Sequence, residues 1–277
     1  MRTTISHVTR LEYDADVTES VIDVRLGPLS DADQNWTRFD LRVRPTAGNR
    51  SYLDGLGNAA RLITIARPHR YIEIVANHEV HTVLNDPFSM PDEPPPPLVP
   101  TERIEFLTPS RLVEISDELI DMAEPYRPRS PDDTLESVQS LMTLVHGRLE
   151  YETGWTDVTT TIREILEHNR GVCQDFTHVL IGLCRAIGIP ARYVSGYIIT
   201  MPDSQRRGTA ASHAWVEAFT PTHGWRGFDP TNNVLASLYH VKMARGRDYQ
   251  DVPPTRGTYR GHARETLSVR VETAASE

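Results

Sequence analysis

The sequence lacks several features that mark special classes of protein. It holds 2 cysteines in 277 residues, too few for the disulfide framework of a small secreted protein. No apolar run approaches the roughly 20 residues that a membrane-spanning helix needs. Residues 1–7 also lack the apolar core of a secretory signal. We therefore expect a cytoplasmic protein without a membrane-spanning part.

No long stretch carries charge of one sign. Acidic and basic residues are interleaved, and the 38 acidic residues outnumber the 29 basic ones, so the net charge is −9. This balance disfavours nonspecific binding to nucleic acid or anionic membranes, and we expect neither as a partner. With 39% hydrophobic and 24% charged residues, the composition fits a globular protein of one large or two modest domains. It does not predict the oligomeric state.

The two cysteines are Cys173 and Cys184. Apolar residues recur at helical spacing from Phe176 to Ile187, which predicts one helix that carries both. On such a helix their Cα atoms lie roughly 16 Å apart, whereas a disulfide requires less than about 7 Å. We therefore expect two free thiols.

The pattern of the chain changes near residue 95. Before it, short alternating or β-branched runs such as Ile22 to Leu26 and Tyr71 to Val75 predict an antiparallel, sandwich-like β unit. The segment Pro91 to Pro97 holds five prolines and fits a linker or a surface loop within one domain. After it, Leu135 to Leu149 show the stripe of a core-facing helix, and a capping box at Thr161 predicts another.

Cys173 is the first candidate for chemistry. It stands in the first turn of its expected helix, where unpaired N–H groups and the helix dipole favour a thiolate. The same N–H groups could stabilise a developing oxyanion. Cys184 lies about three turns further along among apolar residues, so we interpret it as a buried small hydrophobe.

A nucleophilic thiol needs a base and a group that orients the base. His213 begins an alternating strand, and Asp229 ends the next strand after a connector of hairpin length. Antiparallel pairing would bring these two residues to the same physical end, where the carboxylate can fix the tautomer of the imidazole. We predict a triad of Cys173, His213 and Asp229.

Weaker signals leave alternatives open. Asp175 fits a helix cap as well as a substrate contact, and Tyr151 is a candidate oxyanion donor for which core packing is the simpler reading. His78 and His81 resemble half a metal site, but residues three apart on a strand face opposite ways, so we expect no metal there. The segment from Met201 to Ala211 reads as a surface loop.

The motifs around the predicted triad stand in a recognisable order. They are Gly171-Val172-Cys173-Gln174-Asp175-Phe176, Gly188-Ile189-Pro190-Ala191-Arg192-Tyr193-Val194-Ser195-Gly196-Tyr197, His213-Ala214-Trp215-Val216-Glu217, and Trp225 to Pro230. Together they resemble the bacterial branch of the transglutaminase-like superfamily. The first ninety residues resemble the β-rich region that precedes the core in this branch, and Arg245 to Pro254 resemble its C-terminal segment.

The resemblance implies an α+β, papain-like core in which the helix bearing Cys173 packs on an antiparallel sheet bearing His213 and Asp229. On this basis we divide the chain into a β-rich, sandwich-like N-terminal domain over residues 1–95 and a catalytic domain over residues 100–277, with its core at about 155–235. The resemblance also implies a thiol acyl-enzyme that acts on a peptide or amide substrate. We expect no cofactor and no metal.

Among the activities of this superfamily we expect hydrolysis, as in a cysteine protease or amidase. No acidic cluster in the sequence resembles the calcium sites of the animal cross-linking members, and water is the simplest acceptor. The alternatives are a protein-glutamine cross-linking enzyme and a non-catalytic binding or scaffolding protein. The presence of all three triad residues argues against the last. Substrate-binding residues are not identified.

Overall fold

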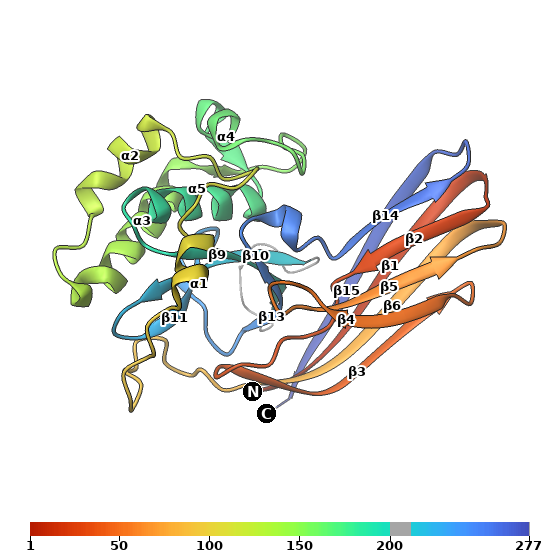
Figure 1. The fold of residues 1–277 in the computed structure, drawn as a ribbon, viewed down its shortest axis with the longest axis horizontal. Helices are drawn as coiled ribbons and strands as arrows, with labels where there is room; N and C mark the ends of the chain where they lie inside the picture. Colours follow the sequence, from red (N-terminus) through yellow and green to blue (C-terminus); the bar gives the residue numbers. More distant parts are fainter. Residues whose placement is uncertain (200–211, 277) are drawn as a thin grey trace.

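A computed structural model describes residues 1–199 and 212–276 of the chain. Helices and a five-stranded antiparallel sheet form one lobe, and long β-strands form the other (Figure 1). Both ends of the chain lie beside each other in the β-rich lobe. The surface loop expected from Met201 to Ala211 lies outside the described residues.

The β-rich lobe is a sandwich of two four-stranded antiparallel sheets, which confirms the expected sandwich. The first sheet has the order β15-β1-β6-β3 and the second the order β14-β2-β5-β4. Apolar side chains that alternate along the strands meet between the sheets, and Ile22, Ile63 and Ile74 are 2% exposed or less. The strands are β1 (Arg2–Val17), β2 (Glu19–Val24), β3 (Gln34–Arg44), β4 (Gly48–Leu53), β5 (Ala59–Ile65), β6 (His69–Thr82), β14 (Thr255–Arg260) and β15 (Glu265–Ser276).

The end of the chain belongs to this sandwich, and this differs from the expected division at residues 95 and 100. Strand β15 pairs with β1 from Arg2↔Ser276 to Tyr13↔Glu265, and β14 pairs with β2. The assignment of everything from 100 to 277 to one catalytic domain therefore does not hold for residues 255–276. The alternation in this segment identifies a strand, but a strand's local pattern does not name the strand with which it pairs.

Helices make up much of the second lobe. They are α1 (Pro100–Glu105), α2 (Asp117–Ala123), α3 (Thr134–Arg148), α4 (Ile162–His168) and α5 (Cys173–Ala186), with short 3₁₀ turns η1 (Glu124–Tyr126), η2 (Pro131–Asp133) and η3 (Tyr249–Asp251). The capping box predicted at Thr161 is present, because the Thr161 N–H donates to Glu164 Oε2 at 2.8 Å. Helix α5 lies at the centre, and its residues Phe176, Leu180 and Leu183 are fully buried.

The sheet beneath α5 has the order β12-β11-β10-β9-β13. Its strands are β9 (Ala191–Ile198), β10 (His213–Thr220), β11 (Gly224–Asp229), β12 (Val234–Leu235) and β13 (His240–Gly246); a small pair, β7 (Glu150–Tyr151) and β8 (Arg170–Gly171), stands apart from it. Alternation along β10 separates two environments. Ala214 and Val216 belong to the apolar cluster with α5, whereas Trp215 and Glu217 do not and border a small cavity.

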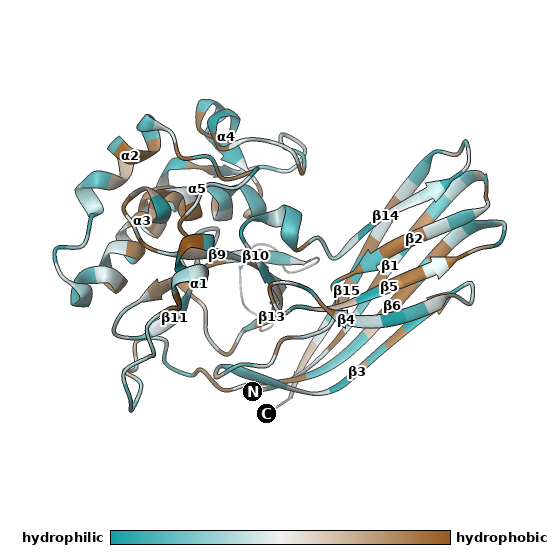
Figure 2. Ribbon diagram, viewed as in Figure 1, coloured by the Kyte–Doolittle hydropathy of each residue, from teal (hydrophilic) through white to brown (hydrophobic). Residues whose placement is uncertain are grey.

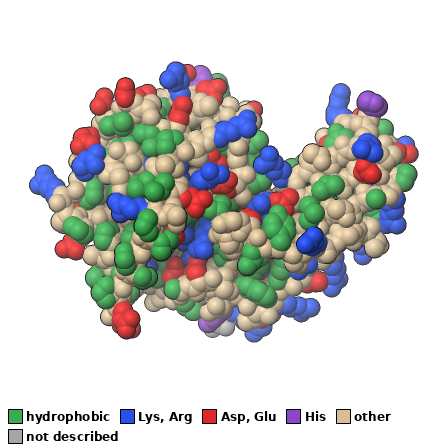
Figure 3. Space-filling view, in the orientation of Figure 1, with side chains coloured by type: hydrophobic (Ala, Val, Ile, Leu, Met, Phe, Trp, Pro, Cys, Tyr) green, Lys and Arg blue, Asp and Glu red, His purple; other side chains and the backbone are tan. Residues whose placement is uncertain are grey.

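Hydropathy and charge follow this layering. Apolar residues alternate with polar ones along the sandwich strands (Figure 2). On the face drawn in Figure 3, acidic and basic side chains are interspersed, and several gather between the two lobes. Within residues 1–199 and 212–276, no helix has the length and apolar content needed to cross a membrane.

Candidate active site

Cys173 is the first residue of α5, as the sequence predicted. Val172 precedes it in an extended conformation, and its N–H donates to Asp175 Oδ2 at 2.7 Å. The Thr156 hydroxyl donates to the same oxygen at 2.6 Å. Through these bonds Asp175 caps the helix that carries the thiol, which is one of the two roles left open for it by the sequence. A Cβ on Gly171 would lie 2.5 Å from this carboxylate, so only glycine fits there.

His213 and Asp229 meet at one end of the β10–β11 hairpin. The two strands pair from Val216↔Phe228 to Thr220↔Gly224, so the start of β10 lies beside the end of β11. His213 Nε2 lies 2.9 Å from Asp229 Oδ2, and neither side chain is exposed to solvent. A buried, hydrogen-bonded carboxylate holds the imidazole in one orientation and one tautomer.

The electrostatics of this pair favour a protonated imidazole. Burial disfavours the charged ring, but the charge and hydrogen bond of Asp229, together with the neighbouring Cys173, raise the pKa of His213 to about 10. Burial likewise opposes ionisation of Asp229, yet His213 and His240 hold the pKa of this carboxyl well below its usual range. Because Nε2 is bound to Asp229, Nδ1 is the nitrogen available to the thiol.

The sequence analysis missed two residues that bind Asp229. The Asn232 amide donates to Oδ2 at 2.8 Å, and His240 Nε2 lies 3.4 Å from the same oxygen. The backbone N–H groups of Thr231 and Asn232 donate to Oδ1 at 3.0 and 3.2 Å. The Asp-to-Asn spacing of a local turn could have indicated Asn232. No local signal could have indicated His240, which comes from a different part of the sheet.

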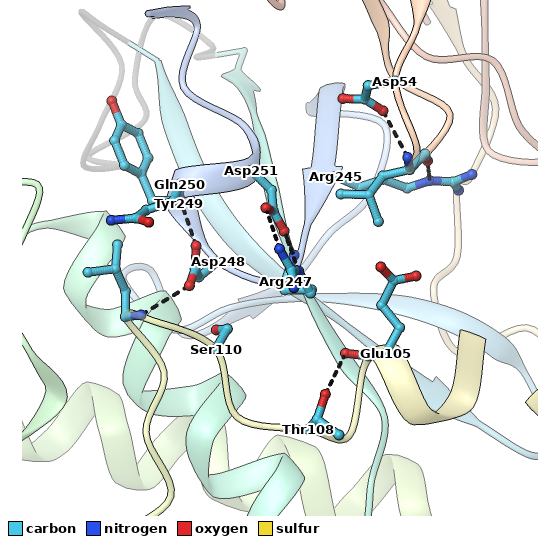
Figure 4. Close-up of polar contacts among 12 residues, drawn as sticks. Asp54, Glu105, Thr108, Ser110, Arg245, Arg247, Asp248, Tyr249, Gln250 and Asp251 are labelled. Carbon is cyan, nitrogen blue, oxygen red and sulfur yellow. Dashed lines mark hydrogen bonds and ion pairs between the residues drawn. The ribbon is translucent and has the colours of Figure 1, made fainter. Parts of the chain in front are cut away.

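The segment after β13 is fixed beside α5 by its own polar contacts (Figure 4). Arg247 donates to both carboxylate oxygens of Asp251, at 2.8 and 2.9 Å. Asp248 Oδ2 accepts from the backbone N–H of Leu112 at 3.0 Å. These contacts hold Tyr249, whose pKa is raised by burial and by the charge of Cys173. Tyr249 is therefore a neighbour of the thiol that the sequence did not single out.

His178 and Tyr151 both lie in the packed core around α5. His178 is fully buried on α5, and its Nε2 accepts the N–H of Tyr249 at 3.2 Å. Tyr151 packs against the core, with its ring centroid 6.3 Å from that of Phe176. Its role as an oxyanion donor stays a hypothesis.

His78 and His81 point to opposite faces of β6, as the spacing of three residues on a strand predicts. His78 is buried and its Nε2 donates to the carbonyl of Leu26, whereas His81 is exposed on the opposite face. Among the described residues, carboxylates of Asp31, Asp33 and Glu217 lie within 4.8 Å of one another. The ammonium of Lys242 already bonds to all three, so this cluster is an internal ion network.

Known proteins similar to this chain indicate its family. Residues 3–81 match the bacterial transglutaminase-like N-terminal region, and residues 121–230 match the transglutaminase-like superfamily. An uncharacterized protein of Mycobacterium tuberculosis, Rv2569c, is 31% identical over 99% of this chain and 92% of its own length. The chain belongs to the transglutaminase-like superfamily. A second relative in this family, ML0607 of Mycobacterium leprae, is 29% identical over 98% of each chain.

A solved structure shows the same fold over the whole length. It is a protein from Cytophaga hutchinsonii described as a candidate cysteine protease, with a TM-score of 0.76 and 23% identity, and the match covers 100% of this chain and 92% of that chain. The match includes the sandwich as well as the core, which confirms the expected α+β, transglutaminase-like architecture.

The environments of the two thiols predict different reactivity. Cys184 is fully buried, and burial raises its pKa to about 12, whereas Cys173 is partly exposed at the helix start. Iodoacetamide at neutral pH should therefore label Cys173 and leave Cys184 unmodified in the folded protein. Peptide mapping by mass spectrometry measures this, and unfolded protein, in which both should react, is the control. Preferential labelling of Cys184 would contradict the assignment.

The raised pKa of His213 predicts a pH dependence of stability. The folded value of about 10 lies above the ordinary 6.5, so this contribution is present below about pH 6.5 and declines as the pH rises to 10. In Asp229→Asn the pairing is absent. Between pH 7 and 10 the wild type should lose up to about 1.4 kcal/mol per pH unit more than this variant. Urea unfolding at several pH values tests this, and parallel curves would refute it.

Proposed function

We propose that this chain is a cysteine-nucleophile acyl-transfer enzyme that hydrolyses peptide or amide bonds. The observation that supports this most directly is the buried 2.9 Å contact between His213 Nε2 and Asp229 Oδ2, with Cys173 next to the same imidazole at a helix start. A histidine so oriented has one nitrogen left for proton transfer with a thiol. Membership in the superfamily agrees with this chemistry without fixing the acceptor.

The proposed reaction uses each of the three groups in turn. The Cys173 thiolate attacks the substrate carbonyl carbon, and the oxyanion forms near the first N–H groups of α5, which lack intrahelical acceptors. His213 Nδ1–H protonates the departing amine as the C–N bond breaks, which leaves a thioester on Cys173. His213 then takes a proton from water, and the water oxygen forms a bond to the thioester carbon. The C–S bond breaks, which releases the carboxylic acid and restores the Cys173 thiolate. Asp229 holds the imidazole throughout.

An acylation assay tests the proposal. Treatment with 4-nitrophenyl acetate should release one equivalent of nitrophenolate in a burst and leave an acetyl group on Cys173, seen by intact mass and peptide mapping. Loss of the adduct in water alone supports hydrolysis. Loss that requires an added primary amine would favour the cross-linking alternative. A folded wild type that forms no adduct with esters or activated amides would instead favour a binding protein.

We propose a cytoplasmic location and no nucleic-acid or membrane partner, on the basis of the mixed charge pattern and net charge of −9.

A further inference from the structure

Asp229 is held from more sides than orientation of one histidine requires. Its Oδ2 atom accepts from His213 and from the Asn232 amide, and it also lies 3.4 Å from His240 Nε2. His240 is 4% exposed and begins β13, which is separated from β11 by β9 and β10. The side chains of His240 and Asp229 nevertheless come within hydrogen-bond distance of each other.

The direction of the His240 hydrogen bond follows from its other nitrogen. The backbone N–H of Ser237 donates to His240 Nδ1 at 3.3 Å, so Nδ1 is an acceptor. In a neutral imidazole the other nitrogen then carries the proton, and Nε2–H donates to Asp229.

Two residues make room for this ring and hold it. Its centroid lies 5.2 Å from that of Trp215 in an edge-to-face arrangement. A Cβ on Gly196 would lie 2.4 Å from the Trp215 ring and 2.2 Å from the Val241 carbonyl. Because position 196 has no side chain, Trp215 can pack over β9, and His240 is fixed between this indole and the carboxylate.

The strand that carries His240 is bound on its outer edge by the N-terminal sandwich. β13 is the edge strand of its sheet. The buried amide of Gln34 donates to the Lys242 carbonyl at 2.7 Å and accepts the Lys242 N–H at 2.8 Å. Asn58 does the same for Arg245, at 2.8 Å in both directions. Two side-chain amides thus replace a missing neighbour strand.

We propose that His240 is a positioning residue for the active site: its Nε2–H fixes Oδ2 of Asp229 in line with His213, and Gln34 of the N-terminal sandwich holds β13 in place for it. The kinetic effects expected of His240 rest on the proposed acyl-transfer function, whereas its contact with Asp229 does not. The proposal gives the sandwich a role in the chemistry, although the sandwich supplies no group that touches the predicted triad.

Kinetics of three variants test the proposal. His240→Leu removes the donor and should lower the rate of acylation of Cys173 on the order of tenfold or more with little change in KM, because small misplacement of a catalytic group is costly. His240→Gln keeps an N–H at the ε position and should recover most of that loss. His69→Leu is the matched control, because His69 is also buried but bonds to Ser20 within the sandwich.

A double-mutant cycle separates positioning from packing. In an Asp229→Asn background, His240→Leu should have little further effect, because the group through which it acts is already changed. Gln34→Leu should resemble a weaker His240→Leu. Any of three results would overturn the proposal. His240→Leu and His240→Gln could lose activity equally, or His240→Leu could keep its full effect in the Asp229→Asn background. The third is a His240→Leu variant that is no less active than His69→Leu.

A spectroscopic readout does not depend on activity. The His213 Nε2–H proton that bonds to Asp229 should give a downfield NMR signal in the wild type and in His240→Gln, and this signal should broaden or vanish in His240→Leu. Persistence in His240→Leu would overturn the proposal. If the wild type forms no acyl-enzyme, the proposed function fails while this measurement still decides the role of His240.

Discussion

Cys173→Ala should abolish acyl-enzyme formation, because the thiol sulfur is the atom that would form the bond to the substrate. His213→Ala should follow it closely, because the imidazole that Asp229 orients beside Cys173 is then missing. Single-turnover acylation with an activated ester measures both effects, with folding checked by circular dichroism. Cys184→Ala is the matched control and should acylate at the wild-type rate. Full activity in Cys173→Ala would end the acyl-enzyme proposal.

Asp229→Asn belongs to the same series and tests the third member of the triad. The amide can hold His213 in the wrong tautomer and no longer stabilises the imidazolium. In a serine triad the corresponding change lowers turnover about 10⁴-fold. We expect less here, on the order of 10- to 10³-fold, because a thiol depends less on a strong base. If Asp229→Asn is neutral while His213→Ala is inactive, another group orients the histidine.

Lys242→Met should cause the largest loss of stability, on the order of 3–5 kcal/mol in the free energy of unfolding. The Lys242 ammonium is buried and bonds to Glu217 and Asp33 at 3.1 Å each, and also to Asp31. Burial opposes ionisation of Glu217, but Lys242 and Arg192 lower its pKa to about 2. Removal of the cation would leave the buried carboxylate of Glu217 facing the partly exposed carboxylates of Asp31 and Asp33, with Arg192 still paired to Glu217.

Chemical unfolding at pH 7 measures this loss. Lys242→Met/Glu217→Gln should be more stable than Lys242→Met alone, because it removes one of the unpaired charges. Arg260→Met, which breaks the exposed pair with Glu19, is the control and should change stability little. A Lys242→Met protein as stable as this control would show that the three carboxylates are relieved in another way, for instance by taking up protons.

Local sequence patterns determined much of this protein. The apolar spacing after Phe176 placed Cys173 at a helix start, and the capping box at Thr161 placed α4. The length of the connector between β10 and β11 brought His213 and Asp229 to one end of a hairpin. Each of these features depends on residues close together in the chain, where spacing and turn length restrict the geometry. Their catalytic roles remain predictions.

Tertiary structure alone decided which distant segments meet. Leu267 and Val269 identify β15 as a strand, but only the folded chain selects β1 as its partner and returns the C-terminal segment to the sandwich. Likewise, the position of His240 gives no sign of a contact with Asp229, because β9 and β10 lie between their strands. Periodicity records which face of an element is buried, whereas the choice of partner depends on edges, shapes and charges that come together only when the whole chain packs.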